Sequence, residues 1–294
     1  MVSFTYYPAS GTPIFQREHW VSSIERTITG SDHSFELNMP ELGSMRVSAD
    51  GTTTYDLQTT EWKLNAMTTG RTGWGKQDTP EGWLVYLPLP LHWHVQSVAS
   101  PAVFQLEIPS QNVPRIDQRG TATIHQEKNW ANSFPSAHIW AQARSPSKDS
   151  GICLAGGKII GMHAFIIGYR SPSLNVDFLP PFALMFAGIA PFMSQAINYG
   201  SRTVSLSVSN FWYKIDVRAQ APKEGGWFGL GSPFPEGHRK NFCTESFLAE
   251  INVVVYERKK WWSWAWMEVQ REKFEMASLE FAGEYFPERG EKRE

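Results

Sequence analysis

The sequence is poor in cysteine and carries no strong excess of either charge. Its 294 residues include 2 Cys, 27 Lys plus Arg and 29 Asp plus Glu, which gives a formal net charge of -2 at pH 7. Cys153 and Cys243 form no CxxC pair, so a disulfide framework and a cysteine-based zinc site are excluded. Because a near-neutral chain lacks the basic surface that binds a phosphate backbone, we expect no nucleic-acid partner.

Signals for export and for membrane insertion are also missing. The first 20 residues have neither the basic region nor the apolar region of a secretory signal, and no Asn-x-Ser/Thr sequon occurs, so we expect a cytoplasmic protein. The uncharged stretch Phe178–Ser201 is interrupted by Pro180, Pro181 and Pro191 and leaves too short an apolar run to span a bilayer. It predicts a buried strand or an apolar flap, without stable membrane insertion.

Long helices are scarce, because few segments show helical periodicity. Short β-branched and aromatic runs lie between Gly, Pro, Asn and Ser clusters, a pattern typical of many short strands. Asp50-Gly51 supplies turn residues for a hairpin over 44–57, and Lys259–Lys273 is a candidate for a helix or for a strand. The other predicted strands are Trp83–Tyr86, His92–Val98, Val103–Ile108, Thr121–Gln126, Ile139–Ala143, Ile152–Ile160, His163–Tyr169, Thr203–Ser209, Phe211–Arg218, Phe247–Glu257 and Phe274–Phe281.

These strands predict an all-β fold of the sandwich or barrel type with little helix. The polar loop RSPSKDSG, residues 144–151, separates two halves of similar length. We therefore expect an N-terminal β domain over 1–145 and a C-terminal β domain over 146–294.

Motifs for the commonest enzyme chemistries are absent, while aromatic residues are abundant. There is no P-loop, no GxGxxG after a strand, no GxSxG and no HExxH, so we expect no cofactor. Aromatic residues make up 14% of the chain, and such residues often line a cavity for an apolar ligand. His92 and His94 share one face of a predicted strand, but no carboxylate follows them at a ligand spacing, and we expect no metal there.

The most distinctive segment is HQEKNWANSFPSAHIWAQ, residues 125–142. Glu127 and Asn129 share one strand face, and His138, Trp140 and Gln142 share one face of the next strand. Between them, Asn-Ser-Phe-Pro at 132–135 is favourable turn chemistry. Two interpretations stay open: a structural corner between domains, or an apolar cavity with a few polar groups.

This segment resembles the signature of the tocopherol cyclase-like, lipocalin-like superfamily, roughly E-x-N-W-G-x-x-F-P-x-x-W-x-W-x-Q. The residues that match it are Glu127, Asn129, Trp130, Phe134, Pro135, Trp140 and Gln142. Two flanking segments, over 86–109 and 154–182, extend the resemblance to about the central third of the chain. Ala131 replaces the usual Gly, and His138 stands where a Trp is expected. The resemblance implies two β domains, with a lipocalin-like barrel in the C-terminal half.

The superfamily includes tocopherol cyclases, carotenoid hydratases and fungal natural-product pericyclases, and this chain looks most like the pericyclases of fungal secondary metabolism. The leading hypothesis is a cofactor-independent Diels–Alder or hetero-Diels–Alder cyclisation, for example of an o-quinone methide with a sesquiterpene alkene. The substrate would be an apolar polyene or terpenoid in an aromatic pocket between the domains. Two alternatives are a non-catalytic lipocalin-like carrier of lipids or terpenoids and a hydratase or proton-driven cyclase.

These hypotheses assign catalytic roles to one set of residues and substrate-binding roles to another. Candidate catalytic residues are imidazoles, a carboxamide and a carboxylate that exchange or donate protons: His138, Gln142, His92, His94 and Glu127. Candidate substrate-binding residues supply apolar walls, hydroxyls or a cation: Trp93, Asn129, Trp140, Phe178, Arg202, Trp212, Tyr213 and Tyr256. The tryptophans over 261–266 are candidate contacts of a homodimer.

Overall fold

The chain divides into two compact units, which are described separately. The computed structural model describes residues 1–30, 34–74, 79–89, 91–131, 135–147, 149–234 and 237–288. The first unit contains residues 1–6, 15–87 and 92–130, and the second contains residues 7–14, 88–91 and 131–294. The polar loop after Arg144, where the sequence predicted a domain boundary, lies inside the second unit and connects two of its strands.

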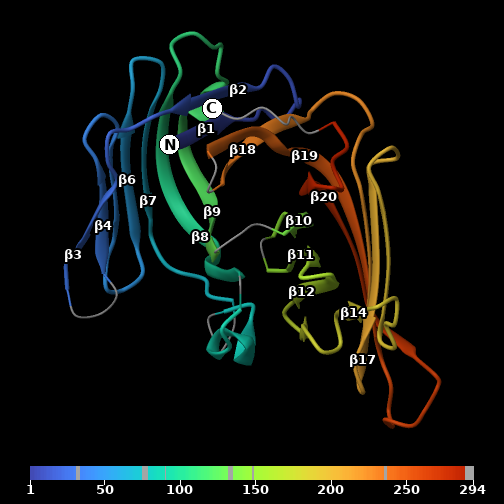
Figure 1. Ribbon diagram of the computed structural model, residues 1–294. Helices are drawn as coiled ribbons and strands as arrows, with labels where there is room; N and C mark the ends of the chain where they lie inside the picture. The colour runs from blue at the N-terminus through green and yellow to red at the C-terminus, as the bar shows by residue number, and fades with distance from the viewer. Residues whose placement is uncertain are drawn as a thin grey trace. The chain divides into compact units, whose positions relative to one another are not determined.

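The first unit is built on a seven-stranded sheet in which each strand lies next to the following one in sequence (Figure 1). Two further strands pair with each other, and helix is limited to the 3-10 turn Gly82–Tyr86 and the short α1 (Arg115–Gln118) among the described residues. The strands are β1 (Val2–Tyr6), β2 (Phe15–His19), β3 (Glu25–Ile28), β4 (Phe35–Met39), β5 (Gly43–Val47), β6 (Thr53–Gln58), β7 (Lys63–Thr68), β8 (Leu91–Glu107) and β9 (Arg119–Ala131).

The core of the first unit is centred on Trp62. Its side chain is buried, stacks on Phe4 with ring centroids 4.1 Å apart, and donates its indole N–H to His19 Nε2 at 2.9 Å. A buried indole thereby keeps both its apolar packing and its hydrogen bond. Phe15 and Leu106 belong to the same cluster, so the strand pair β1–β2 packs against the long strand β8.

The second unit is an eleven-stranded antiparallel sheet in which the last strand, β20, lies between β10 and β19. Its main path runs β13-β12-β11-β10-β20-β19-β17-β16-β15, while β14 pairs with β12 and β18 with β19 (Figure 1). The strands are β10 (Ala137–Arg144), β11 (Gly151–Ile159), β12 (Met162–Arg170), β13 (Asn175–Phe178), β14 (Leu184–Phe186), β15 (Met193–Asn198), β16 (Thr203–Ser209), β17 (Tyr213–Gln220), β18 (Phe228–Phe234), β19 (Gly237–Glu257) and β20 (Met267–Gly283).

This sheet curves around one apolar core in a barrel-like manner. Phe178 of β13 and Met193 of β15, at opposite ends of the strand order, belong to the same buried cluster. The two ends are also linked by side chains, because the Gln195 amide lies 2.7 Å from His163 Nδ1 and Phe182 packs edge-on against Phe192. The interior is filled by side chains from alternate strand positions, as the period of two requires.

The all-β prediction is confirmed, and so is the hairpin over 44–57. It corresponds to β5 and β6, with Gly51 in the turn at a φ of +81°. Two strand predictions are wrong in detail: Trp83–Tyr86 forms the 3-10 turn, and the two segments between His92 and Ile108 belong largely to the single strand β8. The helix alternative for Lys259–Lys273 is also wrong, because a loop over 258–266 leads directly into β20.

The uncharged stretch Phe178–Ser201 contains the end of β13, the short β14 and all of β15. Phe178 and Met193 are buried in the core of the second unit, as the buried-strand prediction requires, while Phe186 and Ile189 are exposed at the β14 turn. Across the described residues, no helix has the length and apolar character needed to cross a bilayer.

Candidate active site

Strand β10 separates two kinds of side chain onto its two faces. Ala137, Ile139, Ala141 and Ala143 are buried, and three of them belong to the core of the second unit. His138, Trp140, Gln142 and Arg144 alternate with them and are half-buried on the opposite face. The predicted sharing of one face by His138, Trp140 and Gln142 is therefore confirmed, and this face points away from the barrel-like core.

A carboxylate on the neighbouring strand fixes the imidazole of His138. Its Nε2 lies 2.8 Å from Oε1 of Glu280, which is on β20 directly opposite Trp140. Because a carboxylate only accepts hydrogen bonds, Nε2 carries the proton and donates it, and Nδ1 becomes the nitrogen available for exchange. The ring is further packed against Phe242, whose centroid is 6.1 Å away.

The same carboxylate lies near a buried thiol. Glu245 of β19 pairs directly with Glu280, and both lie near Cys243. Burial, the charges of Glu280 and Glu245 and a hydrogen bond to Glu280 raise the pKa of the Cys243 thiol well above its usual range. Cys243 therefore stays a neutral thiol at physiological pH, which makes it a poor nucleophile, and it donates to the backbone oxygen of Leu230 at 3.7 Å.

Three buried polar atoms on this face have no protein partner among the described residues. They are His138 Nδ1, Gln142 Oε1 and, at the end of the strand, Arg144 Nε. Buried polar atoms of native proteins are almost always hydrogen-bonded, so a nitrogen and an oxygen on one strand face without a partner are suited to a bound molecule. The candidate site of the second unit consists of His138, Gln142 and Trp140 on β10 with Glu280 on β20.

A second imidazole–carboxylate pair lies in the first unit. The buried Glu81 accepts a hydrogen bond from His92 Nδ1 at 2.8 Å and another from the backbone N–H of Trp93 at 2.5 Å. Trp130 stacks on the His92 ring with centroids 5.2 Å apart and nearly parallel planes. His94 follows on the same face of β8, as predicted. In this pair Nδ1 of His92 is hydrogen-bonded to Glu81 and one face of the ring is covered by an indole.

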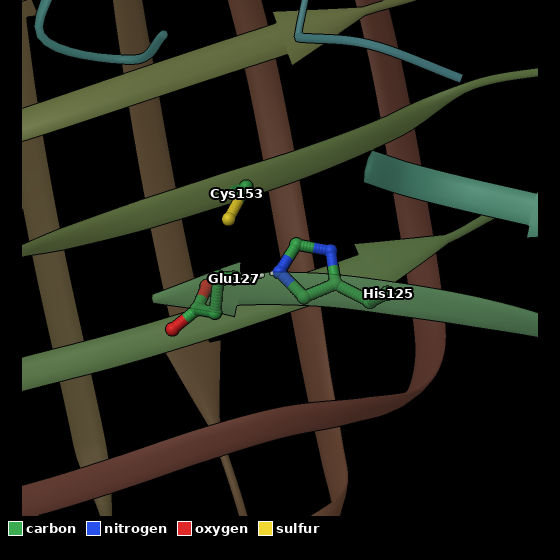
Figure 2. A group of neighbouring side chains, drawn as sticks. All are labelled: His125, Glu127 and Cys153. Atoms are coloured by element: carbon green, nitrogen blue, oxygen red, sulfur yellow. Dashed lines mark hydrogen bonds and ion pairs between the residues drawn. The ribbon is translucent and has the colours of Figure 1, made fainter. Parts of the chain in front are cut away.

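The candidate Glu127 pairs with a histidine of its own strand. His125 Nε2 lies 2.9 Å from Glu127 Oε2, and both residues point from the same face of β9 (Figure 2). Figure 2 also draws Cys153, which belongs to β11 of the second unit. Within either single unit, the described residues bring no three His, Cys, Asp or Glu side chains close enough to share a metal ion.

The predicted binding residues occupy several different environments. Trp93 is buried beside Trp74, Asn129 is exposed on β9, and Phe178 is part of the core of the second unit. Tyr256 is covered by the ammonium of Lys214 at 4.9 Å on the strand opposite, while Trp212 is exposed. Of the predicted site residues in the second unit, only Trp140 and Gln142 share the strand face of His138.

Arg202 and Tyr213 also lie apart from His138. The guanidinium of Arg202 lies 3.4 Å from the ring centroid of Tyr199 and 5.2 Å from that of Trp227, while Tyr213 packs against the core of the second unit. Arg202 donates to the backbone oxygen of Tyr199 at 2.7 Å, and its buried Nε has no partner among the described residues. Stacking between two aromatic rings gives Arg202 a packing function at this position.

Two carboxylates that matter for these pairs, Glu81 and Glu280, were not predicted from the sequence. A weak signal exists for Glu280, because it is the acidic residue inside the otherwise apolar run ASLEFAG at the end of β20. Glu81 precedes a 3-10 turn and has no comparable pattern around it. Residues 132–134, which include Phe134 and the predicted turn, lie outside the described residues.

A glycine on the strand next to His138 is required by close packing. Gly157 pairs with His138, and a Cβ added there would overlap the backbone oxygen of Ala137 and lie 2.6 Å from His138 Cα. Gly157→Ala is expected to lower the free energy of unfolding by about 1–3 kcal/mol and to displace His138. Urea unfolding measures this change. Gly70→Ala is the control, because no atom lies within 4 Å of its added Cβ; equal effects of both variants would contradict the expectation.

The raised pKa of Tyr285 predicts that the free energy of unfolding falls at alkaline pH. Burial, followed by the charge of Glu284, raises the pKa of Tyr285 to about 12, and its hydroxyl lies 3.0 Å from His163 Nδ1. Since the unfolded state loses this proton near its ordinary pKa, the stabilisation is complete below about pH 10 and is lost as pH rises towards 12. In Tyr285→Phe, the free energy of unfolding is expected to fall less steeply between about pH 10 and pH 12. Urea unfolding at several alkaline pH values measures this slope. An unchanged slope would contradict the assignment.

Comparison with known proteins agrees with the resemblance of the sequence. A probable chloroplastic tocopherol cyclase of Oryza sativa subsp. japonica is 24% identical in an alignment of 229 residues, and the match covers 71% of this chain and 44% of the rice protein. The match thus spans less than half the length of this curated relative. Kievitone hydratase from Nectria haematococca superposes with a TM-score of 0.46 at 10% identity, covering 84% of this chain and 70% of that chain. The family model described as tocopherol cyclase-like matches residues 39–283, from β4 to the end of β20, and the chain therefore belongs to the tocopherol cyclase-like family.

Proposed function

We propose that this chain is a cyclase for an apolar, unsaturated small molecule, with His138 as its proton-transfer residue. The observation that carries the proposal is the hydrogen bond of His138 Nε2 to Glu280, which leaves the buried Nδ1 without a protein partner. An imidazole held in one tautomer by a carboxylate is an effective general base and, once protonated, a general acid. Membership of the tocopherol cyclase-like family supports a cyclase reaction, and the geometry of β10 supports His138 as the proton-transfer group.

In its finer form, the proposal is a hetero-Diels–Alder cyclisation that begins from an o-hydroxymethyl phenol. His138 Nδ1 takes the phenolic proton, the bond from the benzylic carbon to its hydroxyl breaks, and the leaving hydroxide receives the same proton. One water is released and an o-quinone methide remains. Its carbonyl oxygen and its methylene carbon then form two bonds with the two carbons of an alkene. No oxidant or reductant is consumed, and His138 returns to its starting state.

Gln142 would act on the same intermediate. Its half-buried side chain lies on the strand face of His138, four residues further along β10, and its Oε1 is buried without a partner among the described residues. A carboxamide offers an N–H donor to the carbonyl of a quinone methide, and a fixed donor lowers the energy of charge that develops on that oxygen. Trp140, which lies between the two residues on this face, provides an apolar surface for the ring.

The test is an assay of the purified protein with an o-hydroxymethyl phenol and a terpenoid alkene, read by chiral chromatography with mass spectrometry. The proposal expects one stereoisomer of the cyclised product, and no deuterium on its ring carbons when the assay is run in D₂O. Deuterium on carbon would instead support a proton-driven cyclase or hydratase, because such a reaction protonates an alkene. Tight binding of the terpenoid without turnover would support a carrier.

The natural substrate is best identified in the source organism. Deleting the gene and comparing metabolites by chiral chromatography is expected to remove one cyclised product and to accumulate its acyclic precursor or a wrongly configured isomer. A change confined to total yield or export would contradict the cyclase proposal. The comparison of metabolites is independent of the assay with a defined phenol, and its result does not depend on having guessed the substrate correctly.

A further inference from the structure

The loop between the two longest strands of the second unit exposes an unusual number of indoles. This tryptophan loop, residues 258–266, connects β19 to β20 and has the sequence RKKWWSWAW. Trp261, Trp262 and Trp264 are 57%, 61% and 94% exposed. In Figure 1 the connection from β19 to β20 projects at the end of these strands. Large exposed aromatic groups gathered in one short segment indicate an interaction surface.

The tryptophan loop is held in place by Arg258. The guanidinium donates to the backbone oxygens of Asn210, Phe211 and Ser263 at 3.0, 2.6 and 3.2 Å. It also lies 4.4 Å from the ring centroid of Trp266. Through these bonds the loop is fixed to the turn between β16 and β17, where Phe211 and Trp212 are themselves half exposed.

The turn between β16 and β17 is itself packed against other residues of the second unit. Phe211 packs edge-on against Phe182 and Phe192, with centroids 5.5 and 6.0 Å away. Asn210 accepts hydrogen bonds from the backbone N–H groups of Trp212 and Tyr213 at 2.8 Å each. The exposed indoles therefore belong to a built platform, and presenting them does not require a further ordering of the chain.

The tryptophan loop itself carries only positive charges, because residues 258–266 include Arg258, Lys259 and Lys260 and no acidic residue. Lys259 and Lys260 are exposed beside the indoles, and the Lys260 ammonium lies 5.6 Å from the ring centroid of Trp262. Glu268, the second residue of β20, forms an ion pair with Arg271, and their nearest charged atoms are 2.6 Å apart. Tryptophan beside lysine is the combination that prefers the boundary between lipid headgroups and acyl chains, and the lysines attract anionic lipid.

We propose that the tryptophan loop docks this protein onto the surface of membranes that contain anionic phospholipid. The indoles enter the headgroup region, Lys259 and Lys260 pair with lipid phosphates, and no segment crosses the bilayer. An anionic bilayer fits this surface better than a protein partner, because the projecting loop combines indoles with cations and contains no acidic residue. The proposal does not depend on the cyclase reaction, and its test needs no substrate.

The experiment is flotation of the purified full chain with vesicles of phosphatidylcholine, alone or mixed with phosphatidylglycerol. We expect binding to the mixed vesicles, weakening as salt rises. Trp262→Ala with Trp264→Ala is expected to reduce the partition coefficient by about tenfold or more, and Lys259→Glu with Lys260→Glu by at least about tenfold. Because these side chains are exposed, the variants are expected to unfold at the same temperature as the wild type.

Trp20→Ala is the matched control, since Trp20 is 62% exposed in the first unit; its binding should equal that of the wild type. Failure of the wild type to float with the mixed vesicles would overturn the proposal, and so would equal binding by the double tryptophan variant. Sedimentation velocity tests the alternative that the tryptophan loop contacts a second copy of the chain. A wild-type dimer that the tryptophan substitutions dissociate, with no vesicle binding, would assign the loop to contact between two copies of the chain.

Discussion

Replacing His138 by alanine is expected to lower turnover by about 10²–10⁴-fold, the usual contribution of a positioned proton-transfer group. The reason is that no other imidazole of the described residues lies on this strand face with Glu280, and that Nδ1 is the unpartnered atom of the pair. Glu280→Gln keeps the shape of the side chain but removes its charge, so it is expected to cause a smaller loss. The measurement is the single-turnover rate of the cyclisation for both variants.

The control for this prediction is Lys158→Ala on the adjacent strand. Lys158 forms an exposed ion pair with Glu284 at 2.8 Å, and exposed pairs contribute at most about 1 kcal/mol. Its removal should leave the rate unchanged. The substrate affinity of His138→Ala should also change little, because a proton-transfer group acts on the reaction barrier. A normal rate in His138→Ala would remove His138 from the mechanism, and a loss confined to affinity would make it a binding residue.

The strands of this fold could be predicted where their pattern is local. β10 alternates small apolar residues with His138, Trp140 and Gln142, and this period of two fixes which side chains share a face. The sequence predicts two strands, His92–Val98 and Val103–Ile108, where the structure has the single long strand β8. In the structure the Ser97 and Ser100 hydroxyls are buried and hydrogen-bonded, Ser100 to Ser97 at 2.7 Å and Ser97 to the Thr72 oxygen at 3.1 Å. Tertiary partners thus override the local turn chemistry.

Only the part of the candidate site that lies in one local motif could be predicted. His138 stood out because a titratable ring replaces an expected indole in the motif. Its partner Glu280 is 142 residues away in sequence, and the pairing of β10 with β20 brings them together. Nothing in either segment specifies that pairing, because strand order and register depend on contacts across the whole sheet. Glu81 and His92 are only 11 residues apart, but an irregular turn separates them and no period relates their directions.

The second large effect is expected in the core of the second unit, at Phe281. Its side chain is fully buried, with the rings of Tyr199 and Trp227 5.6 and 5.9 Å away between centroids. Phe281→Ala is expected to lower the free energy of unfolding by about 3–5 kcal/mol, because the lost apolar contacts leave a cavity that close-packed neighbours cannot fill. Urea unfolding measures the change. Phe186→Ala, at a ring that is 61% exposed, should alter it by less than about 0.5 kcal/mol.

Phe281 also tests how the core and the candidate site are connected. It follows Glu280 on β20, so the two side chains point to opposite faces of the same strand. If the packed interior fixes β20, Phe281→Ala should loosen Glu280 and lower the cyclisation rate in addition to the stability, whereas Phe281→Leu, which refills most of the volume, should restore both. Destabilisation with an unchanged rate would show that the hydrogen bond to His138 holds Glu280 without the packing of Phe281. A stable alanine variant would instead mean that the interior tolerates a void, as a barrel that carries its ligand inside would.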